Sequence, residues 1–269
     1  MRRDRWVMVA RGWEERADAF RRQTMPVSMW MVDAIAPQAG HTVVELAAGI
    51  GDTGYLASEL IEPGGTLITS DYLPEMLSAA QRRAEALGVR NARFKQIDAS
   101  QPIDIEAASV DGVLCRWGYM LMDDGEAALQ ETRRILRPGG RVALAAWAGA
   151  DANQWSSLPV RLLLERGSIE PPPPGAGQFA WAEEGVVAEH LEAAGFVEYE
   201  VDAIDFPMRY ASVRDWWATA RTMGVTVSEA RVDDEAEILS ALADAVSPWM
   251  AADGSLAIPA RTWVAAATG

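Results

Sequence analysis

The sequence predicts an α/β fold whose core is a doubly wound, mostly parallel β-sheet. Short apolar runs alternate with amphipathic helical patterns between residues 43 and 147, as they do in strands joined by crossover helices. The apolar runs are nearly continuous, which indicates strands buried on both faces. Glu45, Asp71, Asp98 and the pair Cys115-Arg116 stand at or next to the ends of four of these runs. Because ligands bind at the carboxyl ends of such strands, these positions predict one binding site.

The first half of the chain supplies the elements of this sheet in order. A helix is expected over 5–23 and a second over 26–36, with Pro26 in its first turn, where a missing N–H is tolerated. Gly88 follows a later helical pattern and ends it. The expected strands are 43–46, 66–70, 92–97, 110–115 and 141–147, and the helices that alternate with them are 53–61, 74–87 and 125–136.

The second half completes the sheet and adds cap segments. Residues 171–174 are prolines and predict a loop, but not a domain boundary, because a helix over 183–194 and a strand over 197–206 are needed to finish the sheet. Two helical stretches follow, around 213–221 and 233–246, and then a last strand over 260–267. A single domain of residues 1–269 is therefore expected. Its N-terminal helical cap is 1–36, and its substrate-cap insertions are 148–180 and 207–255.

Composition limits the class of protein. The 269 residues are 49% hydrophobic, which is enough for a large core, and no apolar run reaches the ~20 residues that span a bilayer. The first residues lack the apolar stretch of a secretory signal, and Cys115 is the only cysteine, so a cytoplasmic protein without disulfides or cysteine-based metal clusters is expected. The net charge of −15 argues against a nucleic-acid partner. Oligomeric state is left open.

A glycine-rich turn after the first strand is the strongest functional signal. Gly49-x-Gly51-x-x-Gly54, with Asp71 about twenty residues later, satisfies the dinucleotide fingerprint. In that fingerprint the first glycine directly follows the strand, whereas here three residues separate Gly49 from Glu45. The Glu45 carboxylate would repel a pyrophosphate but suits a ligand that carries an ammonium group, such as S-adenosylmethionine. The alternatives are an NAD(P)-dependent oxidoreductase and a non-catalytic protein that binds S-adenosylmethionine.

Five motifs in order resemble the class I S-adenosylmethionine-dependent methyltransferases. The segment Glu45-x-Ala47-x-Gly49-x-Gly51 resembles the E/D-x-G-x-G-x-G loop of that family. The other motifs are Asp71 at a strand end, the segment 96–99, the fourth strand over 110–116 and the loop 136–140. Their spacing is closest to small-molecule methyltransferases related to the ubiquinone/menaquinone type. The resemblance covers roughly residues 40–147 and implies seven strands in the order 3-2-1-4-5-7-6, the last one antiparallel.

Ala47 departs from the family pattern, because it replaces the usual first glycine. The methyl group of alanine is tolerated if this position has a negative φ, and it is unfavourable if the turn requires a positive φ.

The resemblance assigns a role to each strand end. Glu45 would accept hydrogen bonds from the amino group of the cofactor, and Asp71 from both ribose hydroxyls. Asp98 would accept from the adenine amine, while the Ala99 N–H reaches a ring nitrogen; a turn-forming aspartate is the alternative for Asp98. Cys115 is interpreted as a small buried residue rather than a nucleophile. The cofactor-binding residues so implied are Glu45, Ala47, Gly49, Gly51, Asp71, Tyr72, Met76, Asp98, Ala99, Cys115 and Arg116.

The acceptor is expected to be a small molecule, methylated by in-line displacement at the sulfonium methyl. Tryptophan is abundant, with 11 residues, and an aromatic-lined pocket would suit a flat, apolar or cationic acceptor. Ordinary core packing is the alternative for each of the side chains. The substrate residues expected from their segments are Trp30, Trp117, Tyr119, Trp216 and Trp217. His41 and His190 are expected at the surface, and neither a catalytic residue nor a metal ligand is named.

Overall fold

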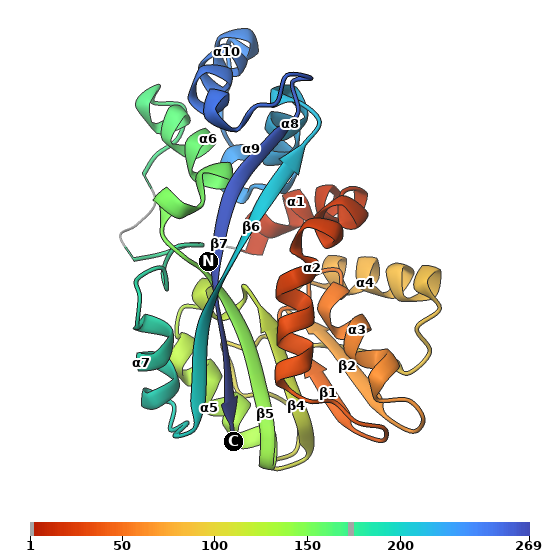
Figure 1. Ribbon diagram of the computed structural model, residues 1–269. Helices are drawn as coiled ribbons and strands as arrows, with labels where there is room; N and C mark the ends of the chain where they lie inside the picture. Colours follow the sequence, from red (N-terminus) through yellow and green to blue (C-terminus); the bar gives the residue numbers. More distant parts are fainter. Residues whose placement is uncertain (1–2, 172–174) are drawn as a thin grey trace.

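A seven-stranded sheet forms the centre of the protein in the computed structural model, which describes residues 3–171 and 175–269. Its strand order is β3-β2-β1-β4-β5-β7-β6 (Figure 1). Strands β1 to β5 are parallel, and β7 is antiparallel to both β5 and β6. The predicted fold class and order are confirmed. The strands are β1 Thr42–Glu45, β2 Thr66–Asp71, β3 Ala92–Gln96, β4 Val110–Arg116, β5 Leu136–Trp147, β6 Tyr199–Tyr210 and β7 Leu256–Thr268.

Helices cover both faces of this sheet. In Figure 1, α2, α3 and α4 lie on one side of the sheet, and α5 and α7 lie on the other. The helices α6, α8, α9 and α10 gather around the long ends of β6 and β7, beyond the carboxyl end of β5, and form a cap. The helices are α1 Arg3–Glu15, α2 Ala17–Ala34, α3 Asp52–Leu60, α4 Pro74–Leu87, α5 Gly125–Ile135, α6 Gln154–Glu165, α7 Val186–Ala193, α8 Val213–Met223, α9 Val225–Ser228 and α10 Glu235–Val246.

The register aligns the strand ends that carry the expected site residues. Glu45 pairs with Thr69 of β2 and with Leu114 of β4, two residues before Asp71 and Arg116 respectively. The last residues of β1, β2 and β4 therefore lie side by side at one edge of the sheet. This edge is where a parallel α/β sheet binds ligands.

Several expected boundaries were wrong. Pro26 lies inside α2 rather than in the first turn of a helix, and the break between α1 and α2 falls at Arg16. The helix tolerates this proline because one face of α2, which includes Val27 and Met31, is buried in the core. Helix α6 was not expected, α7 begins three residues later than expected, and β6 and β7 extend further into the cap. Residues 172–174 of the expected proline loop lie outside the described residues.

A second hydrophobic cluster joins the N-terminal helices to the glycine turn. Ala10 of α1 and Ala17 of α2 pack with Ile50, which lies in the turn, and with Leu73 and Met76 at the start of α4. Ion pairs continue this contact along α4, since Arg82 pairs with Glu14 at 2.7 Å and Arg83 with Asp18 at 3.0 Å. The N-terminal cap therefore closes over the edge of the sheet where β1 and β2 end.

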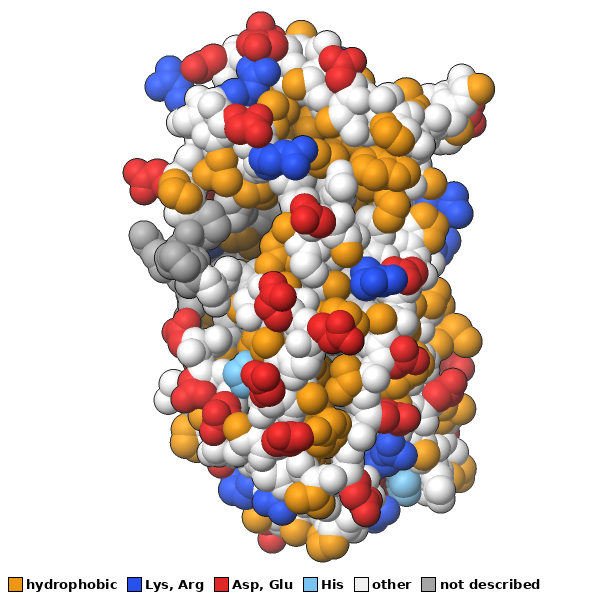
Figure 2. Space-filling view, turned by 60° about the vertical axis from the view of Figure 1, so that its left-hand side comes forward, with side chains coloured by type: hydrophobic (Ala, Val, Ile, Leu, Met, Phe, Trp, Pro, Cys, Tyr) orange, Lys and Arg blue, Asp and Glu red, His pale blue; other side chains and the backbone are white. Residues whose placement is uncertain are grey.

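The outer face of the protein is strongly acidic. Figure 2 shows Asp and Glu side chains scattered over a face of the molecule, with few Lys or Arg between them. The acidic stretch between residues 183 and 205 contributes to this surface through exposed positions of α7 and β6. None of the described helices combines the length and the apolar character needed to cross a bilayer.

Candidate functional site

The glycine turn connects β1 to α3 and leaves open space beside Gly49. Gly49 and Gly51 have φ of +58° and +85°, which glycine adopts without strain. A Cβ atom added to Gly49 would meet no atom within 4 Å, whereas one added to Gly51 would lie 2.4 Å from the ring of Tyr55. The turn is thus closed on the Gly51 side and open on the Gly49 side. A ligand that approaches the backbone at Gly49 would meet the N-terminus of α3, whose N–H groups point outward.

Ala47 has a positive φ of +49°, so the condition for unstrained alanine is not met. The turn needs the left-handed conformation at this position because Ala48 N must turn back to donate to Ser70 O of β2, at 2.8 Å. The methyl group also packs closely: a Cβ atom added to Gly118 would lie 2.7 Å from the Ala47 Cβ. Alanine in place of glycine therefore stores local strain at the predicted site.

Glu45 is a buried carboxyl group with an unused acceptor. The residue is 2% exposed, and its Oε2 has no hydrogen-bond partner among the described residues. Burial raises the pKa of Glu45 to about 8, although the Arg116 guanidinium and the amides of Gly54 and Thr53 favour the ionised form. A buried acceptor without a donor is costly unless a ligand supplies one. Glu45 therefore fits a ligand ammonium group.

Asp71 is held in place by backbone amides. Its Oδ2 accepts from Gly49 N at 2.9 Å, and its Oδ1 accepts from Leu73 N at 3.0 Å. Burial raises the pKa of Asp71, while the amides of Leu73, Gly49 and Tyr72 oppose this change. A carboxylate offers about four acceptor positions, so these amides leave room for a hydroxyl group of a ligand.

Asp98 lies just after β3 and forms a turn. The side chain is exposed, and its Oδ1 accepts from Ser100 N at 3.0 Å, while Ala99 is buried. The turn-forming role is therefore present in the structure, and the adenine role stays a prediction.

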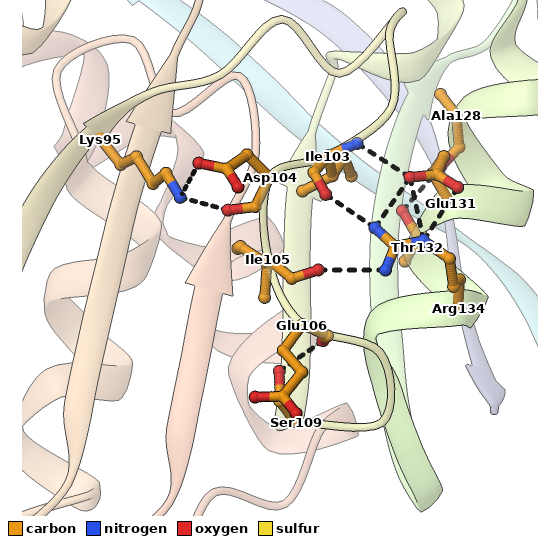
Figure 3. A network of polar contacts seen from close by, with 10 residues as sticks. All are labelled: Lys95, Ile103, Asp104, Ile105, Glu106, Ser109, Ala128, Glu131, Thr132 and Arg134. Atoms are coloured by element: carbon orange, nitrogen blue, oxygen red, sulfur yellow. Dashed lines mark hydrogen bonds and ion pairs between the residues drawn. The ribbon is translucent and has the colours of Figure 1, made fainter.

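The loop that follows Asp98 is anchored to α5. Figure 3 shows Glu131 and Arg134 of α5 facing this loop. Glu131 accepts from Ile103 N at 2.8 Å, and Arg134 donates to the carbonyl oxygens of Ile103 and Ile105 at 2.7 and 3.0 Å. Lys95 of β3 pairs with Asp104 of the same loop at 2.8 Å. These contacts hold the loop that follows the expected adenine segment against α5 and β3.

Tyr72 and Met76 lie beneath the N-terminal cap. Met76 is 4% exposed and belongs to the cluster that joins α1 to the glycine turn, and Tyr72 packs against that cluster while partly exposed. Both side chains are near the end of β2, where the ribose and adenine of the cofactor were expected. Their contact with the cofactor stays a prediction.

Cys115 and Arg116 are the last two residues of β4. Burial raises the pKa of the Cys115 thiol to about 12, which agrees with a packing role and not with a nucleophile. Arg116 Nη1 donates to Thr24 Oγ1 at 2.7 Å and to Ser28 Oγ at 3.0 Å, both on α2. Ser28 Oγ in turn lies 3.0 Å from Thr53 Oγ1 in the first turn of α3.

Sequence reasoning did not find Thr24, Ser28 and Thr53 as part of this edge. Arg116 and Thr24 are 92 positions apart, and no local motif relates them. It also missed the buried ion pair between Asp52, which is 1% exposed, and Arg83 of α4, whose atoms lie 2.7 Å apart.

Trp117 and Tyr119 are buried next to the site, and the polar atoms of their side chains bond to other elements. Trp117 has a φ of +59°, stacks on Trp147 with ring centroids 4.1 Å apart, and donates from Nε1 to Thr262 Oγ1 at 2.9 Å. The Tyr119 hydroxyl lies 2.6 Å from Thr132 Oγ1, and the Tyr119 ring stacks on Trp181 with ring centroids 6.1 Å apart. Trp117 touches the site through Arg116, and the ring of Tyr119 packs between elements.

The remaining expected aromatic residues are packing residues of the cap and core. Trp216 and Trp217 are each 1% exposed, and their indole N–H groups donate to Trp155 O at 2.7 Å and to Glu235 Oε1 at 2.9 Å. Trp30 is partly buried against the main core. The two cap side chains are enclosed and their donors are satisfied, as in ordinary core packing.

The two histidines lie away from the glycine turn. His41 precedes β1, at the opposite end of that strand from Glu45, with its Nε2 3.8 Å from Asp111 Oδ1. His190 is on α7, and its ring stacks on Trp181 at 4.2 Å. Neither position suits a general base for this site.

Comparison with known proteins finds a known domain in the part of the chain that contains the glycine turn and strands β2 to β4. Residues 46–144 match the family model described as a methyltransferase domain. The chain is 27% identical over 197 residues to nocamycin O-methyltransferase of Saccharothrix syringae, and this match covers 70% of each chain. It is 34% identical over 113 residues to demethylmenaquinone methyltransferase of Thermus thermophilus, which is 42% of this chain and 50% of that protein. This chain thus matches about half the length of the second relative.

A solved structure shares the fold over most of the chain. The YcgJ protein of Bacillus subtilis has a TM-score of 0.61 with 20% identity, and the match covers 90% of this chain and 97% of that one. At this identity the likeness concerns the fold. The matched domain and the motif residues at one edge of the sheet agree with this fold. Residues 46–144 of the chain are thus a methyltransferase domain of the class I S-adenosylmethionine-dependent type.

Proposed function

We propose that this chain transfers the methyl group of S-adenosylmethionine to a small-molecule acceptor. One observation carries the proposal: the buried Glu45 Oε2 has no partner among the described residues, next to a glycine turn that is open at Gly49. The amino-acid end of this cofactor carries an ammonium group. This group would reach Glu45 if the cofactor lies close to the backbone of the turn at Gly49. Nocamycin O-methyltransferase and demethylmenaquinone methyltransferase have small molecules in their names, which supports the acceptor class.

The residues at the strand ends would hold the cofactor along its length. Glu45 would accept from the ammonium group, and the Asp71 carboxylate, which the amides hold in place, would accept from the ribose hydroxyls. Asp98 and the Ala99 N–H would take the adenine edge. The order of these residues along the sheet edge, β1, β2 and β3, matches the order of the groups in the molecule.

The sulfonium methyl of the bound cofactor is itself electrophilic, so the protein need not supply a nucleophile. The contribution of the protein is to hold the acceptor in line with the S–CH₃ bond. Such positioning reaches effective molarities of roughly 10⁵–10⁸ M in well-oriented reactions. The N-terminal cap, through α1 and α2, covers the site and would exclude water from it.

The two alternative functions are separated from this proposal by different observations. An oxidoreductase would place a pyrophosphate beside the Glu45 carboxyl. Asp52 is a second buried acidic residue near Glu45, so this part of the site is unfavourable for such an anion. The matched family model also describes a methyltransferase domain. A protein that binds the cofactor without turnover would keep the same site, so only a measurement of product separates it from an enzyme.

The test is a calorimetric titration followed by a turnover assay. Purified protein is titrated with S-adenosylmethionine, S-adenosylhomocysteine, NADH and NADPH, and we expect micromolar binding of the first two alone. Wild-type protein and Glu45→Ala are then incubated with S-adenosylmethionine and a pool of small phenols, carboxylic acids and quinols. Release of S-adenosylhomocysteine by the wild type alone supports the proposal. Binding of a nicotinamide cofactor instead would overturn it.

A further inference from the structure

Arg116 is a guanidinium group fixed at the centre of the site. It is the last residue of β4, and its Nη1 donates to Thr24 Oγ1 at 2.7 Å and Ser28 Oγ at 3.0 Å. Both hydroxyl-bearing residues are buried, at 0% and 3% exposure. Ser28 is linked to Thr53 at the start of α3, so the guanidinium is held close to the N-terminus of that helix. The N-terminal cap thus orients a positive charge at the edge of the sheet.

Aromatic rings enclose the same group. The guanidinium carbon lies 4.8 Å from the centroid of the Trp117 ring and 5.7 Å from that of Phe20. Phe20 also packs edge-to-face against Trp117, with centroids 5.9 Å apart. Arginine stacked on aromatic faces loses side-chain freedom and keeps its planar fork of donors in one orientation.

No carboxylate within the described ranges comes within 4.0 Å of Arg116. Arg83 shows the contrast, because its half-buried side chain pairs with Asp52 at 2.7 Å and Asp18 at 3.0 Å. The two hydroxyl partners of Arg116 are neutral, and they use Nη1 alone. Within the described part of the chain, Nε and Nη2 therefore keep donors that match the two oxygens of a carboxylate.

We propose that Arg116 binds a carboxylate group at the site of methyl transfer, through Nε and Nη2. A carboxylate fits better than a phosphate, because Asp52 lies close enough to interact with Arg116 and would repel a more highly charged anion. The inference rests on the proposed function. Two sources carry this chemistry: the α-carboxylate of the cofactor, which shares a carbon with the ammonium group assigned to Glu45, and a carboxylate on the acceptor.

The first arm of the test separates the cofactor as the source. S-Adenosylmethionine and decarboxylated S-adenosylmethionine are titrated into the wild type, Arg116→Met and Arg116→Lys. If the cofactor supplies the carboxylate, the wild type should prefer the complete cofactor by about tenfold or more. Arg116→Met should bind both molecules with equal affinity, and Arg116→Lys should keep part of the preference, since lysine retains the charge without the fork.

The second arm tests the acceptor as the source. Wild-type protein saturated with S-adenosylhomocysteine is titrated with benzoate and with its neutral counterpart benzamide. If the acceptor supplies the carboxylate, benzoate should bind and benzamide should not, and Arg116→Met should lose this preference for benzoate.

The control variant is Arg221→Met. Arg221 also lies over a tryptophan ring, 5.8 Å from the centroid of Trp217, but it is in the cap. It should retain both preferences. Circular dichroism shows whether each variant folds; if Arg116→Met does not, the comparison of the wild type with Arg116→Lys decides. Equal binding of both pairs of probes by the wild type would overturn the proposal. Failure of the wild type to bind any S-adenosyl ligand would instead overturn the proposed function.

Discussion

Asp71 Oδ2 accepts a hydrogen bond from Gly49 N at 2.9 Å, so the carboxylate that ends β2 is fixed by the turn that follows β1. The other oxygen of Asp71 accepts from Leu73 N at 3.0 Å. The two strand ends are thus joined before any ligand arrives. Because the carboxylate is already oriented, a diol that binds to it does not have to order the side chain, and less conformational entropy is lost on binding.

The first prediction concerns Asp71. Asp71→Ala should weaken the binding of S-adenosylmethionine by about ten- to a hundredfold, since each hydrogen bond to a charged group contributes roughly 1.5–3 kcal/mol. The protein should remain folded, because the lost bonds to Gly49 and Leu73 are two among many. Calorimetric titration measures the affinity, and Asp205→Asn, which alters an exposed ion pair with Arg261, is the matched control. An unchanged affinity in Asp71→Ala would disprove the ribose assignment.

The second prediction concerns the proton on Glu45. Burial raises the pKa of Glu45 from 4.5 to about 8, so the free protein holds a proton on this carboxyl at pH 7. A bound ammonium group favours the ionised form, so binding of S-adenosylmethionine at pH 7 should release close to one proton per site. Titrations in buffers of different ionisation enthalpy measure this proton. Glu45→Gln should release none, and equal release from both proteins would contradict the assignment.

The same pKa has a consequence for the stability of the unliganded protein. Between pH 4.5 and about 8, the native carboxyl of Glu45 keeps a proton that the unfolded chain has lost. Stability falls with rising pH wherever the native state binds more protons, so the contribution of Glu45 decreases across this window. Urea unfolding of the wild type and Glu45→Gln at pH 6 and pH 9 should therefore show a smaller loss of stability in the variant.

Local motifs carried enough information to predict the sheet and the residues at its edge. The apolar strands, the glycine turn and the acids at Glu45 and Asp71 are each encoded within about ten residues, and the structure brings them together. Contacts between distant segments were not predictable in this way. Thr24 and Ser28 reach Arg116 from 92 and 88 positions away, and nothing in their own segment marks them as part of a site.

The direction in which the tryptophan side chains of the cap point could not be predicted from the sequence. Trp216 and Trp217 lie in a cap segment, as expected, but the direction of their side chains is set by how α8 packs against α6 and α10. Pro26 shows the same limit, because the burial of α2 outweighs the preference of proline for a first turn.

The third prediction concerns the strain at Ala47. Ala47→Gly should raise the free energy of unfolding by about 1 kcal/mol, because glycine adopts a φ of +49° without the clash of a Cβ atom. Gly49→Ala, at a φ of +58°, should lower it by a similar amount, about 1 kcal/mol, and should weaken cofactor binding as well. Urea unfolding measures both variants.

A neighbouring alanine supplies the control for this comparison. Ala48 does not have a positive φ, so Ala48→Gly should destabilise the protein by roughly 0.5–1 kcal/mol through the entropy of the unfolded chain. If Ala47→Gly destabilised the protein as Ala48→Gly does, the left-handed conformation of the turn would be refuted.

The fourth prediction uses Cys115 as a reporter of opening at the site. The side chain is fully buried at the end of β4, and burial raises its pKa to about 12. Only the thiolate reacts with disulfide reagents, so the native protein at pH 8 should be labelled very slowly by an aromatic disulfide, whereas the urea-unfolded protein should react at once. Labelling of the native protein then measures how often the end of β4 and the glycine turn separate, because Gly118 lies against both Cys115 Sγ and the Cβ of Ala47 in that turn. Since S-adenosylmethionine would bind only the closed form, a saturating amount should slow the labelling further, by the same factor as it raises the stability of that form. Rapid stoichiometric labelling of the native protein would show that Cys115 is accessible and that β4 does not end in a closed core.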